Sequence, residues 1–413
     1  RSPQFLDLLR YGEDSEFENF FINWNRFWEG MGEMTSEGYI QPRKELIQDM
    51  FFRKPGLPIL MVPFPDGRKV PYWNTFYQEL RGETYLGQMD LNVKSPKVWE
   101  FYQDIIGKLA GYGARIVRLD AFAYAPKEPG KKNFLNEPET WELLAKVQSL
   151  AEGYGLQLLP EIHASYEEKI YEKLASQGYV TYDFFLPGLI IDAMERQSGD
   201  RLTAWARELR EKRIRTVNML GCHDGIPLLD LKGMLPEEQI LSLIDTVVSR
   251  GGYVKNLHGQ KNVYYQVNAT YYSALGEDDG KMLLARALQL FMPGKPQIWY
   301  LDLFAGKNDY EAVKRAGAGG HKEMNRTNLT VAEAEERLKL AVVKEQLSMI
   351  RFRNTFPAFE QDADFQMECD GSRLAVSWEH REYRARLTAD LAACTFQIQG
   401  TDPYGKVRYE VCN

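Results

Sequence analysis

Short apolar runs and longer amphipathic stretches alternate along the chain from about residue 115 onward. Five such runs recur: "ARIVRLDA", "LQLLPEIH", "YVTYDFFLP", "IRTVNMLGCHD" and "KPQIWYLDLF". Apolar runs of this length, separated by helical patterns, are typical of parallel strands that are buried on both faces. The pattern therefore predicts an α/β fold built from βα units.

The helices between the strands carry start and stop signals of their own. Ser95 and Pro96 open a helix with one apolar face, and Gly111 stands at its end. A second amphipathic helix begins near Pro138 and ends at Gly153. Serine or proline at a start and glycine at an end are the residues that helix boundaries favour.

The composition and the hydrophobic pattern of the sequence change twice along the chain, which predicts three domains or regions. Residues 1–94 contain an aromatic, irregular region rich in Pro and Gly, which predicts an inserted domain without long elements. Residues 95–356 hold the five strands and their helices. Residues 357–413 contain the short alternating segments "RLAVSWEH", "YRARLTADL", "CTFQIQG" and "KVRYEV", which predict a small antiparallel β domain. Periodicity alone leaves a barrel and an open doubly wound sheet equally possible for the middle part.

Acids and histidines follow three of the predicted strands. Asp120 ends the first run, Glu161 and His163 end the second, and His223 and Asp224 end the fourth. One such Asp is usually a helix cap or a turn former, and a histidine there is either a donor to a sugar hydroxyl or a satisfied core imidazole. Three strand ends that deliver acids favour the barrel, because barrel enzymes carry their catalytic residues at this edge.

These acids have the chemistry of a retaining glycoside-cleaving enzyme. Such an enzyme needs an ionised nucleophile about 5 to 5.5 Å from a protonated acid. Arg118 is expected to keep Asp120 ionised, and the apolar residues before Glu161 are expected to raise its pKa by desolvation. Asp224 is expected to stabilise the positive charge of the transition state.

Composition and charge narrow the class of protein. The chain has 413 residues and a net charge of -7, which argues against general nucleic-acid binding. Four scattered cysteines without paired or metal-like spacing predict reduced thiols and a cytoplasmic protein. No apolar run reaches the ~20 residues of a membrane span, and neither a metal site nor an organic cofactor motif is evident. The start is neither a signal peptide nor a methionine, which is consistent with a chain that begins partway through a larger protein.

The segments "RLDA", "EIH" and "HD", in this order and spacing, resemble the α-amylase clan of glycoside hydrolases, family 13. Most of residues 2–353 is similar to the sucrose phosphorylase branch of that clan, including "YDFFLPGLI", "YYQVNATYYSALG", "LFAGKNDY" and "MNR". The resemblance implies a (β/α)8 TIM barrel whose first three strands are missing from this sequence. It also implies that Asp120 is the nucleophile, Glu161 the acid/base and Asp224 the transition-state stabiliser.

The same resemblance suggests how the substrates bind. Arg326 is expected to hold the far hydroxyls of the glucosyl unit, and Gln266 to contact the acceptor. Tyr124 and Tyr265 are expected to line the pocket shared by phosphate and acceptor, although both are also explained as core aromatics.

The leaving group is predicted from a position at which this chain differs from the sucrose phosphorylases that it resembles. The sucrose phosphorylases that the chain resembles usually carry an acid three residues before the glutamine of "YQVN", where this chain has Val263. The loop before Val263 instead offers Lys255, His258 and Lys261 as cationic groups. The inserted region offers Arg68 and Lys69. Because cations suit a phosphorylated leaving group, we expect phosphorolysis of sucrose 6-phosphate to α-glucose 1-phosphate and fructose 6-phosphate. A solvated polar loop is the alternative explanation of these cations.

Other functions also remain compatible with the sequence. The chain could be a phosphorylase of another α-glucoside, such as glucosylglycerate or glucosylglycerol, a hydrolase or transglucosylase, or an inactive relative or fragment. In every enzymatic case the partners are a small sugar or sugar phosphate and inorganic phosphate, without a cofactor, a nucleic acid or a membrane. A monomer or a homodimer is expected.

Overall fold

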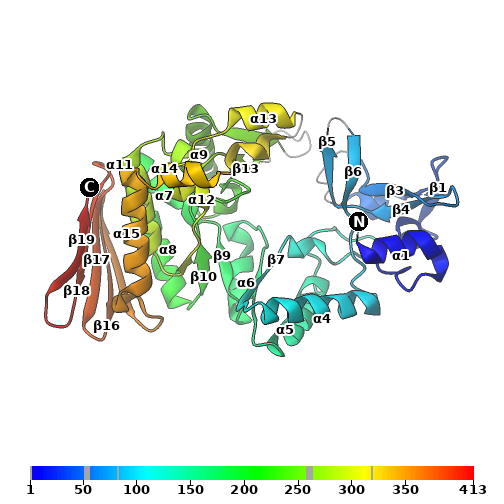
Figure 1. Cartoon of the computed structure of the whole chain (residues 1–413), viewed down its shortest axis with the longest axis horizontal. Helices are drawn as coiled ribbons and strands as arrows, with labels where there is room; N and C mark the ends of the chain where they lie inside the picture. The colour runs from blue at the N-terminus through cyan, green and yellow to red at the C-terminus, as the bar shows by residue number, and fades with distance from the viewer. Residues whose placement is uncertain (1, 51–55, 81–82, 257–263, 318–319) are drawn as a thin grey trace. The chain divides into compact units, whose positions relative to one another are not determined.

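The structure is a computed structural model that describes residues 2–50, 56–80, 83–256, 264–317 and 320–413. It gives no side-chain description for residues 77–80, 83–88, 255–256 and 264–265. The chain divides into two compact units, one formed by residues 1–162 and the other by the described residues from 163 onward (Figure 1). The predicted boundaries at residues 94 and 356 stay predictions.

The N-terminal unit consists of short strands and two long helices. Its helices are α1 (Pro3–Tyr11), α2 (Trp24–Phe27), α3 (Lys44–Ile47), α4 (Pro96–Gly111) and α5 (Glu139–Glu152). Its strands are β1 (Gly32–Met34), β2 (Ile40–Pro42), β3 (Ile59–Pro63), β4 (Lys69–Trp73), β5 (Phe76–Leu80), β6 (Glu83–Gln88), β7 (Ile116–Leu119) and β8 (Gln157–Pro160). The first six strands form three antiparallel hairpins, whereas β7 and β8 are parallel.

Buried aromatic rings hold the irregular first part of this unit together. The Trp24 and Trp73 ring centroids lie 4.8 Å apart, and both side chains are almost fully buried. The Trp28 ring packs 5.8 Å from Trp24 in the same cluster. Large rings bury much apolar area per residue, so a segment with few long elements can still form a core.

Strand β7 follows the first of the two predicted helices and β8 follows the second, and both helices are confirmed. Helix α4 begins at Pro96 with Ser95 as its N-cap residue, and α5 begins directly after Pro138. The prediction that both strands are buried on both faces is wrong for β7, because all four of its residues are only partly buried. Strand β7 pairs with β8 alone among the described strands, so it is an edge strand.

The C-terminal unit contains most of the helices. They are α6 (Ile170–Ser176), α7 (Leu186–Arg196), α8 (Asp200–Glu211), α9 (Glu237–Ser249), α10 (Tyr271–Ala274), α11 (Asp279–Phe291), α12 (Tyr300–Leu303), α13 (Tyr310–Ala316), α14 (Val331–Arg337) and α15 (Ala341–Thr355). Its strands are β9 (Thr181–Asp183), β10 (Thr216–Asn218), β11 (Ile226–Pro227), β12 (Tyr253–Asn256), β13 (Tyr264–Asn268), β14 (Lys295–Pro296), β15 (Asp364–Asp370), β16 (Arg373–His380), β17 (Tyr383–Asp390), β18 (Thr395–Thr401) and β19 (Val407–Cys412).

Three predicted strands form one parallel sheet in the order β14-β10-β9. The last of them is far shorter than predicted. Strand β14 comprises Lys295 and Pro296, and α12 begins four residues later at Tyr300. One further ladder contact follows, in which the N–H of Gln297 donates to the carbonyl of Asn218 over 2.8 Å. The described residues thus show an α/β fold with parallel strands, and these strands do not close into a barrel.

The C-terminal strands β15 to β19 form one antiparallel sheet in sequence order. Four of the five follow the predicted alternating segments. Strand β15 was missed because "DFQMECD" carries charges at both ends and one buried residue, Met367. The inner face of the sheet shares its core with α8, α11 and α15 (Figure 1).

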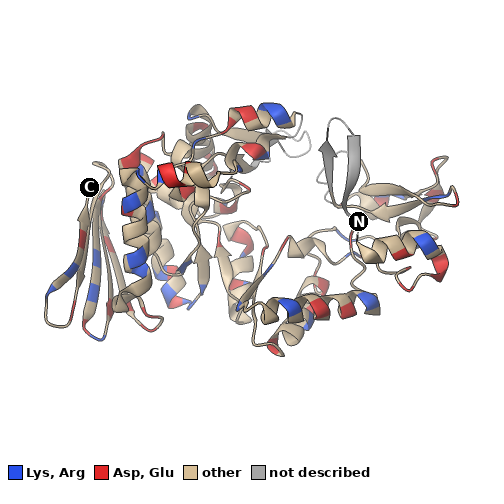
Figure 2. Ribbon diagram, viewed as in Figure 1, with Lys and Arg blue, Asp and Glu red and all other residues tan. Residues whose placement is uncertain are grey.

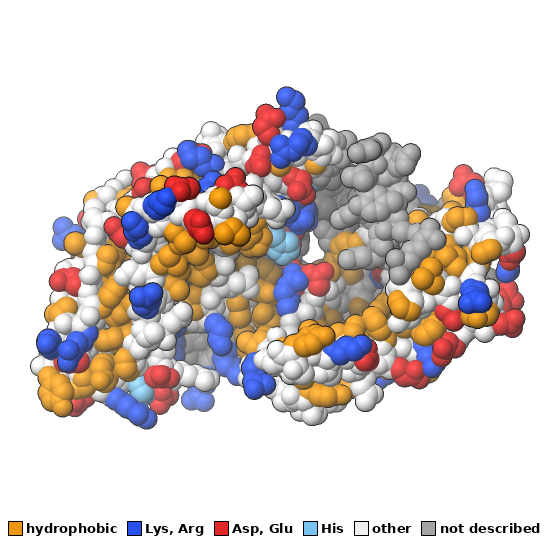
Figure 3. Space-filling model, viewed as in Figure 1, with side chains coloured by type: hydrophobic (Ala, Val, Ile, Leu, Met, Phe, Trp, Pro, Cys, Tyr) orange, Lys and Arg blue, Asp and Glu red, His pale blue; other side chains and the backbone are white. Residues whose placement is uncertain are grey.

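Acidic and basic residues are interleaved along the helices of both units (Figure 2). Figure 3 shows hydrophobic side chains scattered among them on the visible face. Within the described part of the chain, no helix combines the length and the apolar character that crossing a bilayer requires.

Candidate active site

Strands β7 and β8 end at the same edge, and each delivers one of the predicted acids. The N–H of Glu161 donates to the carbonyl of Leu119 over 3.0 Å, which extends the parallel ladder to the acids themselves. Arg118 lies between the two acids. Its Nη1 is 2.5 Å from Oδ1 of Asp120, and its Nη2 is 2.8 Å from Oε1 of Glu161. Because one planar guanidinium contacts both carboxylates, these lie within a few ångströms of each other.

The two acids differ in their surroundings. The side chain of Asp120 is 66% exposed and that of Glu161 is 12% exposed. The second oxygen of Glu161 accepts the N–H of Ala121 over 2.9 Å. Burial favours the neutral form of Glu161, whereas Arg118 favours the charged form, so the two effects oppose each other. A raised pKa of Glu161 stays a prediction.

Ala121 has a left-handed backbone conformation, with φ 47° and ψ 35°. A residue with a Cβ rarely adopts this conformation, which costs on the order of 1 kcal/mol. The turn points the amide that follows Asp120 at Glu161. The hydrogen bond from the Ala121 amide is therefore a second connection between the segments of the two acids, besides Arg118.

The loop after Asp120 is anchored inside the N-terminal unit. The Tyr124 ring packs against Phe76 at 5.3 Å and Phe134 at 4.8 Å between centroids. The carbonyl of Tyr124 accepts a hydrogen bond from Lys127, whose side chain is 1% exposed and pairs with Asp90 over 2.8 Å. The Tyr124 ring thus has the aromatic neighbours expected of a core residue. Its contact with phosphate or acceptor stays a prediction.

Asp224, in the C-terminal unit, is surrounded by cationic groups. Its Oδ1 is 2.8 Å from Nζ of Lys322 and 2.9 Å from Nη2 of Arg326, and its Oδ2 is 3.2 Å from Nε2 of His223. Burial disfavours the charge of Asp224, but Lys322, His223 and Arg326 outweigh burial and hold its pKa well below the usual range. The side chain is therefore a carboxylate, which is the form that stabilises a cationic transition state.

Side-chain amides hold the backbone of the loop that carries Asp224. Asn268 donates to the carbonyl of Asp224 over 2.9 Å, and Asn325 donates to the carbonyl of Cys222 over 2.8 Å. Burial raises the pKa of the Cys222 thiol to about 12, so this thiol stays protonated. The sequence analysis does not identify Asn268, Asn325 or Lys322 as residues of the candidate site. The signal for Lys322 was its place in the segment "HKEMNR", together with the predicted arginine.

Other predicted sugar-binding residues have partners within the protein. Nδ1 of His163 is 3.3 Å from Asp230, and its ring stacks on Phe184 with 3.8 Å between centroids. This geometry fits a core imidazole at least as well as a donor to sugar. Gln266 lies in β13 opposite Pro227 and is buried. The sugar-binding roles of His163, His223 and Gln266 stay predictions.

The predicted phosphate-binding cations are only partly described. Arg68 is exposed and already pairs with Asp66 over 2.7 Å and with Glu13 over 3.3 Å. Lys69 is exposed at the start of β4. The side chains of Lys255 and Tyr265 lie outside the described part, and so do three whole residues: His258, Lys261 and Val263.

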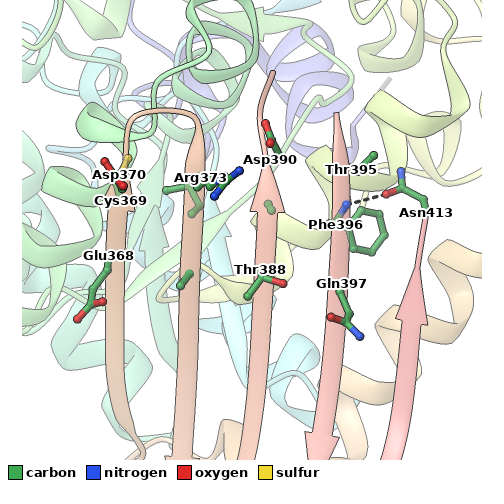
Figure 4. A pocket seen from close by; sticks show the side chains of 13 residues that line it. Glu368, Cys369, Asp370, Arg373, Thr388, Asp390, Thr395, Phe396, Gln397 and Asn413 are labelled. Carbon is green, nitrogen blue, oxygen red and sulfur yellow. Dashed lines mark hydrogen bonds between the residues drawn. The ribbon is translucent and has the colours of Figure 1, made fainter. Parts of the chain in front are cut away.

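A pocket of about 560 Å³ opens on the C-terminal sheet, away from these residues in the sequence (Figure 4). Its lining includes Glu368, Arg373, Thr388 and Gln397, and none of the predicted site residues is among the described residues that line it. In the same part of the chain, no group of three or more His, Cys, Asp or Glu side chains is placed to hold a metal ion.

The similarity to known proteins covers nearly the whole chain. A sucrose 6(F)-phosphate phosphorylase of Ilumatobacter coccineus is 54% identical over 411 residues, which cover 96% of this chain and 78% of that protein. The crystal structure of sucrose 6F-phosphate phosphorylase from Thermoanaerobacter thermosaccharolyticum is 35% identical, with a TM-score of 0.88 over 100% of this chain and 80% of that one.

More distant comparisons concern the fold alone. An α-amylase from H. orenii is 16% identical with a TM-score of 0.56, over 97% of this chain and 69% of that one. A scan against models of protein families gives no match. From the extent of the identity and the shared fold, the chain belongs to the α-amylase family of glycoside hydrolases (family 13), in its sucrose 6F-phosphate phosphorylase branch.

Proposed function

We propose that this chain catalyses the phosphorolysis of sucrose 6-phosphate, in which the phosphate group sits on the fructosyl unit. The products are α-glucose 1-phosphate and fructose 6-phosphate. The observation that carries the proposal is the 54% identity, over 96% of the chain, to a protein named for this reaction. The bridge from Arg118 to Asp120 and Glu161 supports it independently, because a retaining mechanism requires two carboxyl groups this close.

In the first proposed step, the carboxylate of Asp120 attacks the anomeric carbon. The bond to the fructosyl oxygen breaks as Glu161 gives that oxygen its proton, and fructose 6-phosphate leaves. Both oxygens of Glu161 accept a hydrogen bond, one from the Ala121 amide and the other from Arg118, and each has a second lone pair that can carry the proton. Asp224 stabilises the oxocarbenium-like transition state with its negative charge.

In the second step, a phosphate oxygen attacks the same carbon and releases Asp120. Two inversions at one carbon give net retention, which is why the product is the α-anomer. Glu161, now ionised, accepts the proton if phosphate arrives as its monoanion. Arg118 keeps Asp120 a good leaving group, because it stabilises the carboxylate that is released.

The preference for a phosphorylated leaving group is proposed from sequence. Val263 stands where sucrose phosphorylases usually carry an acid, and an acid would repel a phosphate dianion. Arg68 and Lys69 remain candidate contacts, although Arg68 must first release Asp66 and Glu13. We also propose a cytoplasmic location, which suits the reduced thiols expected from the cysteine spacing.

The deciding experiment supplies the chain with sucrose 6-phosphate or with sucrose, each with and without inorganic phosphate. We expect α-glucose 1-phosphate only when phosphate is present, and a higher kcat/KM for the phosphorylated sugar. Equal or better cleavage of plain sucrose would refute the substrate, and glucose release that ignores phosphate would refute the phosphorylase activity. His258→Ala should weaken the use of sucrose 6-phosphate and leave that of sucrose unchanged.

A further inference from the structure

One fully buried carboxylate contacts the backbone next to two of the segments that carry predicted site residues of the C-terminal unit. Asp302, in α12, has 0% exposure. Its Oδ2 accepts the N–H of Gly221 over 3.0 Å, and its Oδ1 accepts the N–H of Tyr271 over 3.1 Å. Gly221 precedes Asp224 by three residues, and Tyr271 follows the strand that contains Gln266.

The closeness of Gly221 to Asp302 leaves no room for a side chain. A Cβ atom on Gly221 would lie 2.9 Å from Oδ2 of Asp302. The glycine thus lets the loop backbone approach the carboxylate directly, and the N–H that it offers has a charged acceptor. Hydrogen bonds to a charged group contribute about 1.5–3 kcal/mol, more than neutral ones.

A second set of contacts immobilises α12 itself. Gln346 donates to the carbonyls of Asp302, over 3.3 Å, and Leu303, over 3.0 Å. Its Oε1 accepts Nε of the fully buried Arg286 over 2.9 Å. Buried charges of this kind are costly compared with apolar residues of the same size. Their presence next to the Asp224 loop points to a role beyond stability.

We propose that Asp302 is a positioning residue for Asp224, which it holds in place through the amide of Gly221. This inference rests on the proposed function, since the value of a fixed Asp224 is its effect on the transition state. The carboxylate joins the loop after β10 to the β13–α10 segment, so the two segments keep one relative arrangement through the catalytic cycle.

The test uses Asp302→Asn, because the amide keeps the shape but presents an NH2 group to one of the two backbone N–H groups. We expect kcat and kcat/KM for phosphorolysis to fall together by about tenfold to a hundredfold, the effect of a small misplacement of a catalytic group. Gly221→Ala, which disturbs the same contact from the other side, should act similarly.

A matched control exists in the same unit. Asp183 also has 0% exposure and also accepts two backbone N–H groups, from Phe185 over 3.2 Å and Leu186 over 3.0 Å. These bonds begin α7 and do not involve the Asp224 loop. Asp183→Asn makes the same change to a buried carboxylate as Asp302→Asn, but should leave kcat per folded molecule unchanged.

Hydrogen exchange of the amides of residues 219–225 separates this inference from the proposed function. We expect faster exchange there in Asp302→Asn than in Asp183→Asn or the unmodified chain. Unchanged exchange, or a loosened loop with undiminished kcat, would overturn the positioning role. If the unmodified chain exchanged as expected but performed no phosphorolysis, the loop anchor would stand and the proposed reaction would fall.

Discussion

Replacement of Arg118 by lysine tests the pairing of the two candidate catalytic acids most directly. Arginine contacts Asp120 with one nitrogen and Glu161 with another, 2.5 Å and 2.8 Å away. A lysine ammonium is a point charge on a flexible stem and cannot reproduce this planar fork. Arg118→Lys therefore keeps the charge but loses at least one of the two contacts.

The expected magnitude follows from the exposure of the two acids. Water can replace the lost partner of Asp120, whose side chain is 66% exposed, but hardly that of Glu161 at 12%. A charge-assisted hydrogen bond in such a shielded place contributes about 1.5–3 kcal/mol. If that energy acts in the transition state, kcat/KM should fall roughly 10- to 150-fold.

The assay is the rate of α-glucose 1-phosphate formation from sucrose 6-phosphate at fixed phosphate. Arg115→Lys is the matched control, because Arg115 is exposed and lies directly before the same strand. It should keep kcat/KM within a factor of about 2, as surface changes usually do. Full activity of Arg118→Lys would refute the claim that this guanidinium organises the two acids.

Three further changes test the electrostatics of the two units, all by urea unfolding. Lys322→Met should lower the unfolding free energy at pH 7 by about 1 kcal/mol, since the pair is partly exposed. The deficit should shrink below pH 4, because the pKa of Asp224 is depressed in the folded chain only. Burial raises the pKa of Asp183 from 3.8 to about 6, so its contribution to stability should fall by about 3 kcal/mol as the pH rises between these values, and Asp183→Asn should remove that contribution while that of Asp302 remains. Lys127→Met should cost about 1.5–3 kcal/mol, because the carboxylate of Asp90 loses its cationic partner, although it keeps its hydrogen bonds from Thr75, and adding Asp90→Asn should recover part of the loss. An unchanged unfolding curve for any of these variants would contradict its assignment.

Local signals in the sequence were enough for the regular elements. The start of α4 at Pro96 and the last four strands follow from capping residues and alternation over a few positions. Helix α12 escaped prediction because "IWYLDLF" looks like a buried strand. A tertiary interaction favours the helix over a longer strand. The carboxylate of Asp302 accepts hydrogen bonds from the N–H groups of Gly221 and Tyr271, which are remote in sequence.

By itself, the sequence determined the chemical identity of the candidate site and the family. Acids at strand ends are a local property, and family motifs are short. Only the tertiary structure decided which partner holds each acid, because Lys322 is 98 residues from Asp224, and Asp302 is 81 residues from Gly221. No periodicity reports pairs at such separations. Their contacts arise when packed elements bring the chain back on itself, and the energy of a buried charge then depends on which group it meets.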